Sequence, residues 1–485
     1  MSDSPNRPGP SSAAGDLARA TDAARPASPA QHGIWLTSRL THVPEVFHLA
    51  LRIGFDRIDT DALARAVAAT VARHPALSSA LVERDGVLHP VPAGRAPALT
   101  VAEPVGEPLG ECADACADAA AKRLAEELTL PFDLARGPLV RFTLDRRADG
   151  GAELLVVAHH AVFDGHSKDV LVADLAAGYA AALRSSVADE ERPEGVASAA
   201  GADTDANTDA DSAPLDPDLL ARAAAFHGPR WAAATAPVLP GGPRAVTDAG
   251  PGESVSWRLD GPARAALADA ARTAGVTRFE FLLAALHGLL HRYGGEAVPV
   301  AVPFSTRGPR QRDTIGLYVN ELPVYAPAGQ DGDTPFARYA AAVRAEARLV
   351  SAHRAVPFGS AVPGLTPRAG LAPVSFGYRR RTTADPAFPR STAEVDWTVF
   401  PHAARNTLHL QAVDGADGIE LSLQYDPAVL ASAAARRVAG HLATLLAAAV
   451  ADPATPLGDL PLLDGAERQL VTTAWNDTAH AYPAD

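Results

Sequence analysis

The chain has 485 residues, of which 47% are apolar and 21% are charged, as in ordinary globular proteins with more than one core. Its net charge of −14 argues against a nucleic-acid partner, because phosphate binding requires a basic face. Two cysteines, Cys112 and Cys116, exclude a disulfide scaffold and are too few for a zinc site. Without an apolar run of membrane-spanning length or a signal-peptide core, we expect a cytoplasmic protein with no membrane partner.

The N-terminal part begins with polar residues 1–24, which we expect to be disordered. Thr60 can cap a helix whose apolar positions recur every four residues from Leu63 to Val71. A second helix is predicted over residues 111–128. These segments predict an N-terminal lobe that starts near residue 25 and contains helices between its strands.

Two strands follow, over residues 139–145 and 153–160. The second is apolar on both faces, which indicates a buried strand, and it ends in two histidines. Asp164 and Gly165 then form a tight turn, and Ser167 is the expected N-cap of the next helix.

An acidic stretch over residues 187–216 is poor in large apolar side chains, so we expect a disordered linker or insertion. It divides the chain into lobes at 25–186 and 217–465, and residues 466–485 form a tail. Both lobes mix helices with strands, which predicts an α/β or α+β fold class.

One helix of the second lobe opens with a capping box, Thr277 and Glu280, and carries His287 and His291 four residues apart. That spacing can bind zinc, but the glutamate of the metalloprotease pattern is absent and the neighbours are apolar. We therefore expect an ordinary helix face and no metal site.

The histidines at 159 and 160 carry the most chemical information. Adjacent strand residues point to opposite faces, so only one of them can serve a given cleft. A histidine there, with the carboxylate of Asp164 four residues on, suits an imidazole positioned to move a proton near neutral pH. The alternative is a capped strand end with two structural histidines.

The whole segment 159–165 resembles the His-His-x-x-x-Asp-Gly signature of condensation domains of nonribosomal peptide synthetases, within the chloramphenicol acetyltransferase-like superfamily. Six further segments resemble other motifs of that family, in the same order along the chain. They are residues 28–35, 73–77, 131–139, 315–320, 356–358 and 373–378. The resemblance covers residues 28–485, nearly all of the chain expected to be ordered.

The resemblance implies two chloramphenicol acetyltransferase-like lobes arranged as a V-shaped pseudo-dimer, with a tunnel between them. It implies that His160 is catalytic and that His159 supports it. Asp164 would pair with Arg307, and Gly165 would leave room for a pantetheine arm. Asn320 would line the tunnel.

It also implies an acyltransferase that binds no cofactor of its own. Donor and acceptor carrier proteins would deliver their substrates on 4′-phosphopantetheine arms, and the acceptor amine would attack the donor thioester to form an amide. The tail, 466–485, resembles the start of a linker to a downstream adenylation domain. We expect a monomer.

The chain departs from the family pattern after Gly165, where His166 and Lys168 flank Ser167 instead of the usual Trp-Ser. This departure leaves open an unusual subtype that forms an ester or modifies a residue by dehydration or similar chemistry. An acyl-CoA-dependent acyltransferase and a degenerate domain that only recruits partners are the remaining alternatives.

Overall fold

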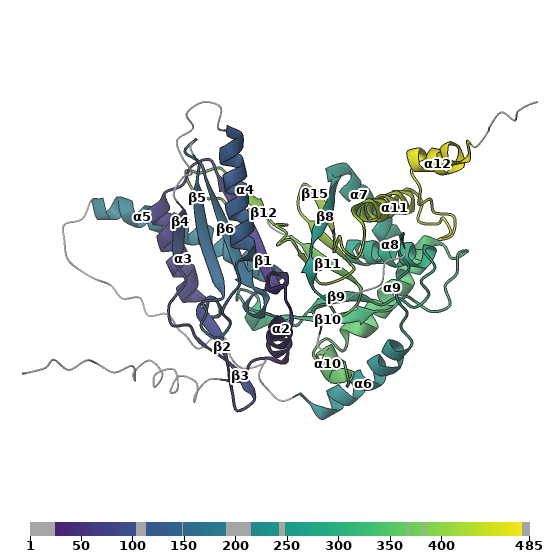
Figure 1. Cartoon of the computed structure of the whole chain (residues 1–485), viewed down its shortest axis with the longest axis horizontal. Helices are drawn as coiled ribbons and strands as arrows, with labels where there is room; N and C mark the ends of the chain where they lie inside the picture. Colours follow the sequence, from purple (N-terminus) through teal and green to yellow (C-terminus); the bar gives the residue numbers. More distant parts are fainter. Residues whose placement is uncertain are drawn as a thin grey trace, which may run out of the picture. The chain divides into compact units, whose positions relative to one another are not determined.

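The computed structural model describes residues 25–102, 113–147, 149–190, 215–241, 248–365, 368–381 and 384–477. The predicted N-terminal extension, Cys112, most of the acidic stretch and the last eight residues lie outside these ranges. The described residues form two compact units (Figure 1).

Unit 1 contains the described residues up to Leu215 and two later segments, Arg307–Val319 and Asp385–Pro401. We call these two the crossing segments. Its five-stranded sheet has the order β12-β1-β6-β5-β4, and β2 and β3 form a hairpin. The strands are β1 (His48–Phe55), β2 (Ser79–Arg84), β3 (Val87–Pro92), β4 (Leu99–Ala102), β5 (Val140–Arg146), β6 (Ala152–His159) and β12 (Ala393–Asp396).

The helices of unit 1 cover both faces of this sheet. Figure 1 shows α3 and α5 together on one face and α4 on the other. The helices are α2 (Pro29–Leu40), α3 (Thr60–Arg73), α4 (Ala113–Thr129) and α5 (Gly165–Glu190), with 3₁₀ turns η1 (Pro44–Phe47), η2 (Pro75–Ser78), η3 (His160–Val162) and η4 (Pro309–Gln311).

Strand β6 is the centre of unit 1, because it pairs antiparallel with both β1 and β5. Its residues from Leu154 to Ala158 are all buried, and the most exposed of them, Leu155, retains only 6% exposure. On the α4 face, Leu155 and Val157 pack with Leu128 of α4. The predicted buried strand is therefore confirmed, and its end places His159 inside the unit.

Two predicted N-caps are wrong. Asp59, not Thr60, caps α3, since its carboxylate accepts the N–H of Ala62 at 2.8 Å. Likewise Asp164, not Ser167, accepts the first free N–H of α5, from Ser167 at 2.8 Å. A carboxylate accepts such bonds more strongly than a hydroxyl, and each aspartate directly precedes its helix.

Unit 2 contains Asp216–Thr306, Asn320–Ala384 and the described residues from His402 onward. Its six-stranded sheet has the order β10-β9-β11-β14-β15-β8, and β7 pairs with β13. The strands are β7 (Gly250–Pro251), β8 (Glu253–Asp260), β9 (Val300–Ser305), β10 (Val319–Val324), β11 (Val374–Arg380), β13 (Ala403–Ala404), β14 (Leu408–Asp414) and β15 (Gly418–Tyr425).

One apolar core holds the helices of unit 2 to its sheet. Alternate residues of β11 and β14 point into it, such as Phe376 and Leu410, and meet α8 and α11. The helices are α6 (Pro217–Ala232), α7 (Gly261–Thr273), α8 (Arg278–Arg292), α9 (Phe336–Ser351), α10 (Phe358–Ala361), α11 (Ser432–Ala451) and α12 (Gly465–Thr472), with the 3₁₀ turn η5 (Ala474–Asn476). The capping box of Thr277 and Glu280 is confirmed at the start of α8.

Both units combine a mixed sheet with helices, so the predicted α/β class is confirmed. Of the helices described, none has the length and apolar character that a membrane-spanning segment requires. The predicted lobe boundaries and the predicted passage between lobes stay predictions. What the structure adds is that β12 and Arg307, far along the chain, belong to unit 1.

Candidate active site

His159 ends β6 and is almost completely buried. Its Nδ1 accepts the N–H of Ala161 at 3.2 Å, and its Nε2 lies 3.4 Å from the hydroxyl of Ser38. Burial, with smaller effects from His48 and His160, lowers the pKa of His159 to about 3. The ring is therefore neutral at physiological pH and serves to shape the loop that follows.

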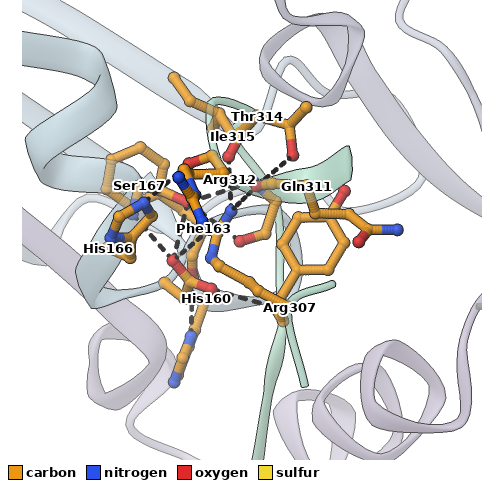
Figure 2. Close-up of polar contacts among 12 residues, drawn as sticks. His160, Phe163, His166, Ser167, Arg307, Gln311, Arg312, Thr314 and Ile315 are labelled. Atoms are coloured by element: carbon orange, nitrogen blue, oxygen red, sulfur yellow. Dashed lines mark hydrogen bonds and ion pairs between the residues drawn. The ribbon is translucent and has the colours of Figure 1, made fainter. Parts of the chain in front are cut away.

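His160 opens the 3₁₀ turn η3 and is partly exposed. Its Nδ1 lies 2.8 Å from the carbonyl oxygen of Phe163 (Figure 2). A carbonyl can only accept, so Nδ1 carries the proton, and the neutral ring has its lone pair on Nε2. The loop thus fixes the orientation of the ring and identifies Nε2 as its basic atom.

Asp164 is fully buried and accepts four hydrogen bonds. Its Oδ1 accepts from the backbone N–H and hydroxyl of Ser167, both at 2.8 Å, and from Nη2 of Arg307 at 2.7 Å. Its Oδ2 accepts the N–H of Tyr318 at 3.0 Å. Buried charges are tolerated when paired and hydrogen-bonded in this way.

Arg307 comes from the first crossing segment and is itself fixed by that segment. Its Nη1 donates to the carbonyls of Gln311 and Thr314, each at 2.7 Å, and its guanidinium lies 4.5 Å from the ring centre of Tyr318. Figure 2 shows Arg307 beside the histidine loop. The structure therefore brings together His159, His160, Asp164 and Arg307.

Gly165 and Asn320 differ from these four. Gly165 opens α5 directly after Asp164, in the same loop as the histidines. Asn320 belongs to unit 2, where its amide donates to the carbonyls of Arg354 at 2.9 Å and Val356 at 2.7 Å. That amide holds the residues before α10, and the predicted roles of both residues toward a substrate arm stay predictions.

Sequence reasoning missed His48, which is buried beside His159 on the neighbouring strand. Its Nδ1 lies 2.7 Å from the carbonyl of Leu128, and burial lowers its pKa to about 4. In the described part of the chain its Nε2 has no hydrogen-bond partner. A lone histidine more than a hundred residues before the motif gave no sequence signal of this contact.

His74, in the second motif, also contacts the first crossing segment. Its Nε2 lies 2.6 Å from Asp174 of α5, and its Nδ1 accepts the N–H of Ile315 at 3.4 Å. When Nε2 carries the ring proton and donates it in a hydrogen bond to the carboxylate, Nδ1 has a lone pair that can accept. Both contacts therefore use the same tautomer of the ring. The motif thus has a structural use that its sequence did not reveal.

A metal site would require several histidine, cysteine or acidic side chains close together. Among the residues that the structure describes, no group of three or more could hold a metal ion. His287 of the helical pair is instead packed into the core of unit 2, and burial lowers its pKa to about 3. The site that remains is an oriented imidazole beside a buried ion pair, which can accept and return one proton.

A cavity of about 640 Å³ lies elsewhere in unit 1. Its walls include Arg52 and Leu155 of the sheet and Arg123 and Leu124 of α4. Neither histidine of the motif lines it, nor does Asp164. The assignment of the site therefore depends on the geometry of the loop and not on this cavity.

Comparison with known proteins gives a consistent family. The family model described as "Condensation domain" matches residues 22–197 and 230–472. Chondramide synthase cmdD of Chondromyces crocatus is 28% identical over 94% of this chain and 12% of its own length. Malpibaldin synthetase of Mortierella alpina is 25% identical over 94% of this chain and 8% of its own length. The chain thus spans about a tenth of these curated relatives.

Two solved structures share the fold. The starter condensation domain of rhizomide synthetase, in complex with C8-CoA and Leu-SNAC, superposes with a TM-score of 0.75 at 18% identity, covering 92% of this chain and 99% of that one. The first condensation domain of the calcium-dependent antibiotic synthetase gives a TM-score of 0.72 at 21% identity, covering 92% and 100%.

Proposed function

Because the chain belongs to the condensation-domain family of nonribosomal peptide synthetases, whose members are amide-forming acyltransferases, we propose that His160 handles the proton of its reaction. The single observation that carries this is the hydrogen bond from Nδ1 to the carbonyl of Phe163. It leaves the lone pair of the neutral ring on Nε2, the atom that must face an attacking amine.

In the proposed reaction the acceptor amine attacks the carbonyl carbon of the donor thioester. The C–N bond forms, the C–S bond breaks, and the thiol leaves. The amine proton passes to Nε2 of His160 and from there to the leaving sulfur, so the histidine returns to its starting state. No covalent enzyme intermediate is required, and most of the rate would come from proximity and this one proton-handling group.

The substrates of this proposal arrive on carrier proteins. The relatives of this chain are synthetases about ten times longer than it is, and their length supports carrier domains as partners. We propose a donor acyl group and an acceptor aminoacyl group, each on a 4′-phosphopantetheine arm, and an adenylation domain downstream that selects the acceptor. Gly165 and Asn320 would contact these arms, and His159 would hold the loop.

The test is a reconstituted condensation with synthetic donor and acceptor thioesters loaded on two separate carrier proteins. Wild type should yield a condensed product on the acceptor carrier by intact-protein mass spectrometry, and His160→Ala should yield almost none. Equal product from His160→Ala and wild type would refute the role of the histidine. Replacing the donor carrier by acyl-CoA tests the remaining enzymatic alternative, because an acyl-CoA-dependent acyltransferase would form product from that donor.

The same product decides between amide and ester formation. Mild base releases the product from the carrier by cleaving its thioester and would also cleave an ester within the product, but it leaves an amide intact. We therefore expect the released product to retain its acyl group. Loss of the acyl group under those conditions would indicate an ester-forming subtype.

A further inference from the structure

Lys168 is one of only two lysines in the 485 residues and lies in the first turn of α5, four residues after Asp164. It is buried, and its ammonium donates to the carbonyl of Ala50 at 2.6 Å and to that of Trp397 at 3.1 Å. Ala50 lies on β1, and Trp397 lies in the second crossing segment.

These two carbonyls lie where the pairing of β1 with β12 ends. The antiparallel ladder runs from Phe55↔Ala393 to Arg52↔Asp396 and stops there. Trp397 is the next residue of the crossing segment, and Ala50 lies two residues beyond Arg52. Beyond the end of the ladder, strand pairing no longer supplies hydrogen-bond donors for these two carbonyls. Lys168 supplies them instead, and it thereby links the backbone of β1 to that of the second crossing segment.

The neighbouring residues of the same turn hold the other crossing segment. His166 places Nε2 2.8 Å from the carbonyl of Arg312 (Figure 2). The hydroxyl of Ser167 accepts the N–H of Gly316 at 3.1 Å. Three consecutive side chains therefore attach both crossing segments to one helical turn, directly after the loop that carries His160.

A buried ammonium is an expensive way to gain stability, because its desolvation offsets much of what its hydrogen bonds return. An apolar side chain of similar length would fill the same space without that cost. The ammonium instead fixes the relative position of two segments, because it can donate to a carbonyl of each at the same time. The choice of residue therefore favours a role in positioning over a role in stability.

We infer that Lys168 is a positioning residue for His160: by fixing where β12 leaves the sheet, it fixes the turn that ends the histidine loop. This inference rests on the proposed function of His160. Reaction rates depend steeply on placement, so a small shift of the turn reduces the rate of the chemical step without weakening substrate binding.

The first test uses the chemistry of the two lysines and does not depend on activity. Lys122 is the internal control, because its side chain is 78% exposed. In the folded full chain, acetylation with an N-hydroxysuccinimide ester should modify Lys122 at least about a hundredfold faster than Lys168, and the two rates should converge in denaturant. A folded-state rate at Lys168 within about threefold of Lys122 would overturn the inference.

The second test measures kcat and KM in the carrier assay. We expect Lys168→Met to lower kcat at least about tenfold while KM for the acceptor carrier changes by less than about twofold, at temperatures well below the melting transition. Lys168→Arg should recover most of the loss, since it can donate to both carbonyls, and Lys122→Met should match wild type. An unchanged kcat in Lys168→Met would overturn the inference.

If Lys168→Met does not fold, Lys168→Gln decides instead, because its amide can still donate to one of the carbonyls. A reduced kcat in that variant supports positioning, and a wild-type kcat refutes it. Failure of the proposed function looks different from failure of this inference: wild type itself would then form no product, while the acetylation result would be unaffected.

Discussion

Two histidine pairs, one in each unit, have opposite surroundings in the structure. At the end of β6, His160 has its Nδ1 on a carbonyl and stands beside the buried pair of Asp164 and Arg307. On α8, His287 lies in the apolar core, where within the described residues neither ring nitrogen has a hydrogen-bond partner. Each pair thus contains a buried ring, but within the part of the chain described, hydrogen bonds to ring nitrogens occur only in the pair at the end of β6.

Spacing in the sequence alone therefore does not show whether a histidine can take part in catalysis. A strand end leads into a loop, and the loop supplies carbonyls, a carboxylate and partial exposure. The middle of a buried helix supplies only apolar side chains, because its backbone groups already bond to one another. The predictions that follow test this difference between the β6 loop and α8, beginning with the largest effect.

Activity should separate the two pairs most strongly. We expect His160→Ala to lower kcat by about 10²–10⁴-fold, the usual contribution of a proton-handling side chain. His287→Leu, a substitution of similar volume in the core, should retain wild-type kcat within about twofold. Product formation by mass spectrometry checks both variants, and a similar loss in the two would contradict the comparison.

Stability should respond most to the ion pair beside His160. We expect Asp164→Ala to lower the free energy of unfolding by about 3–5 kcal/mol, because Arg307 is left buried without its carboxylate. Arg307→Ala should have a similar effect, whereas His160→Ala should fold normally.

Denaturant titrations of the three single variants and of Asp164→Ala/Arg307→Met check this ordering. The double variant should recover part of the loss, since it leaves neither buried charge uncompensated. Equal midpoints for Asp164→Ala, Arg307→Ala and His160→Ala would show that the pair does not hold the loop.

The free energy of unfolding should depend on pH through the buried ring of His287 on α8. The folded pKa of His287 is about 3, below the value near 6.5 of an unfolded histidine, so the unfolded state binds the proton first. The stability that depends on the neutral ring is complete above pH 6.5 and is lost as pH falls toward 3. His287→Leu should remove this dependence.

Between pH 7 and 4.5 we expect wild type to lose about 2–3 kcal/mol more than His287→Leu, measured by urea unfolding at each pH. His159, with a folded pKa of about 3, has the same sign and acts in both proteins, so it cancels in the difference. Parallel pH profiles for the two proteins would argue that His287 is not buried in the native state.

Zinc should give the smallest effect. A ligand that binds only the folded state raises its stability in proportion to the logarithm of its concentration. Since His287 faces the core, we expect zinc at tens of micromolar to shift the melting temperature by less than about 1 °C. A rise of several degrees in wild type that His291→Ala abolishes would show that the helix pair binds metal.

Local features could be predicted from the sequence because they depend on near neighbours. The buried strand β6 and the capping box of α8 follow from residue types within a few positions of one another. The tight turn predicted at Asp164 and Gly165 is instead the start of α5. The pairing of Asp164 with Arg307 was accessible only through the family resemblance, since nothing near either residue indicates the other.

Contacts between distant segments could not be predicted. Lys168 binds carbonyls 118 and 229 positions away, and the carbonyl of Leu128 meets His48 across 80 positions. A backbone carbonyl is present at every residue, so the sequence carries no mark of which one is used. The capping errors at Asp59 and Asp164 have a more local origin, because two cap-forming side chains compete within one turn.

The return of Arg307–Val319 and Asp385–Pro401 to unit 1 has a practical consequence for recombination. A fragment that ends in the acidic stretch would lack β12, which leaves β1 as an open sheet edge, and would lack the arginine that neutralises Asp164. Chimeric synthetases assembled by exchanging only the first half of such a domain would combine a histidine loop with crossing segments from another parent. Exchanges that carry both segments together with the first unit should preserve these contacts and yield more folded protein.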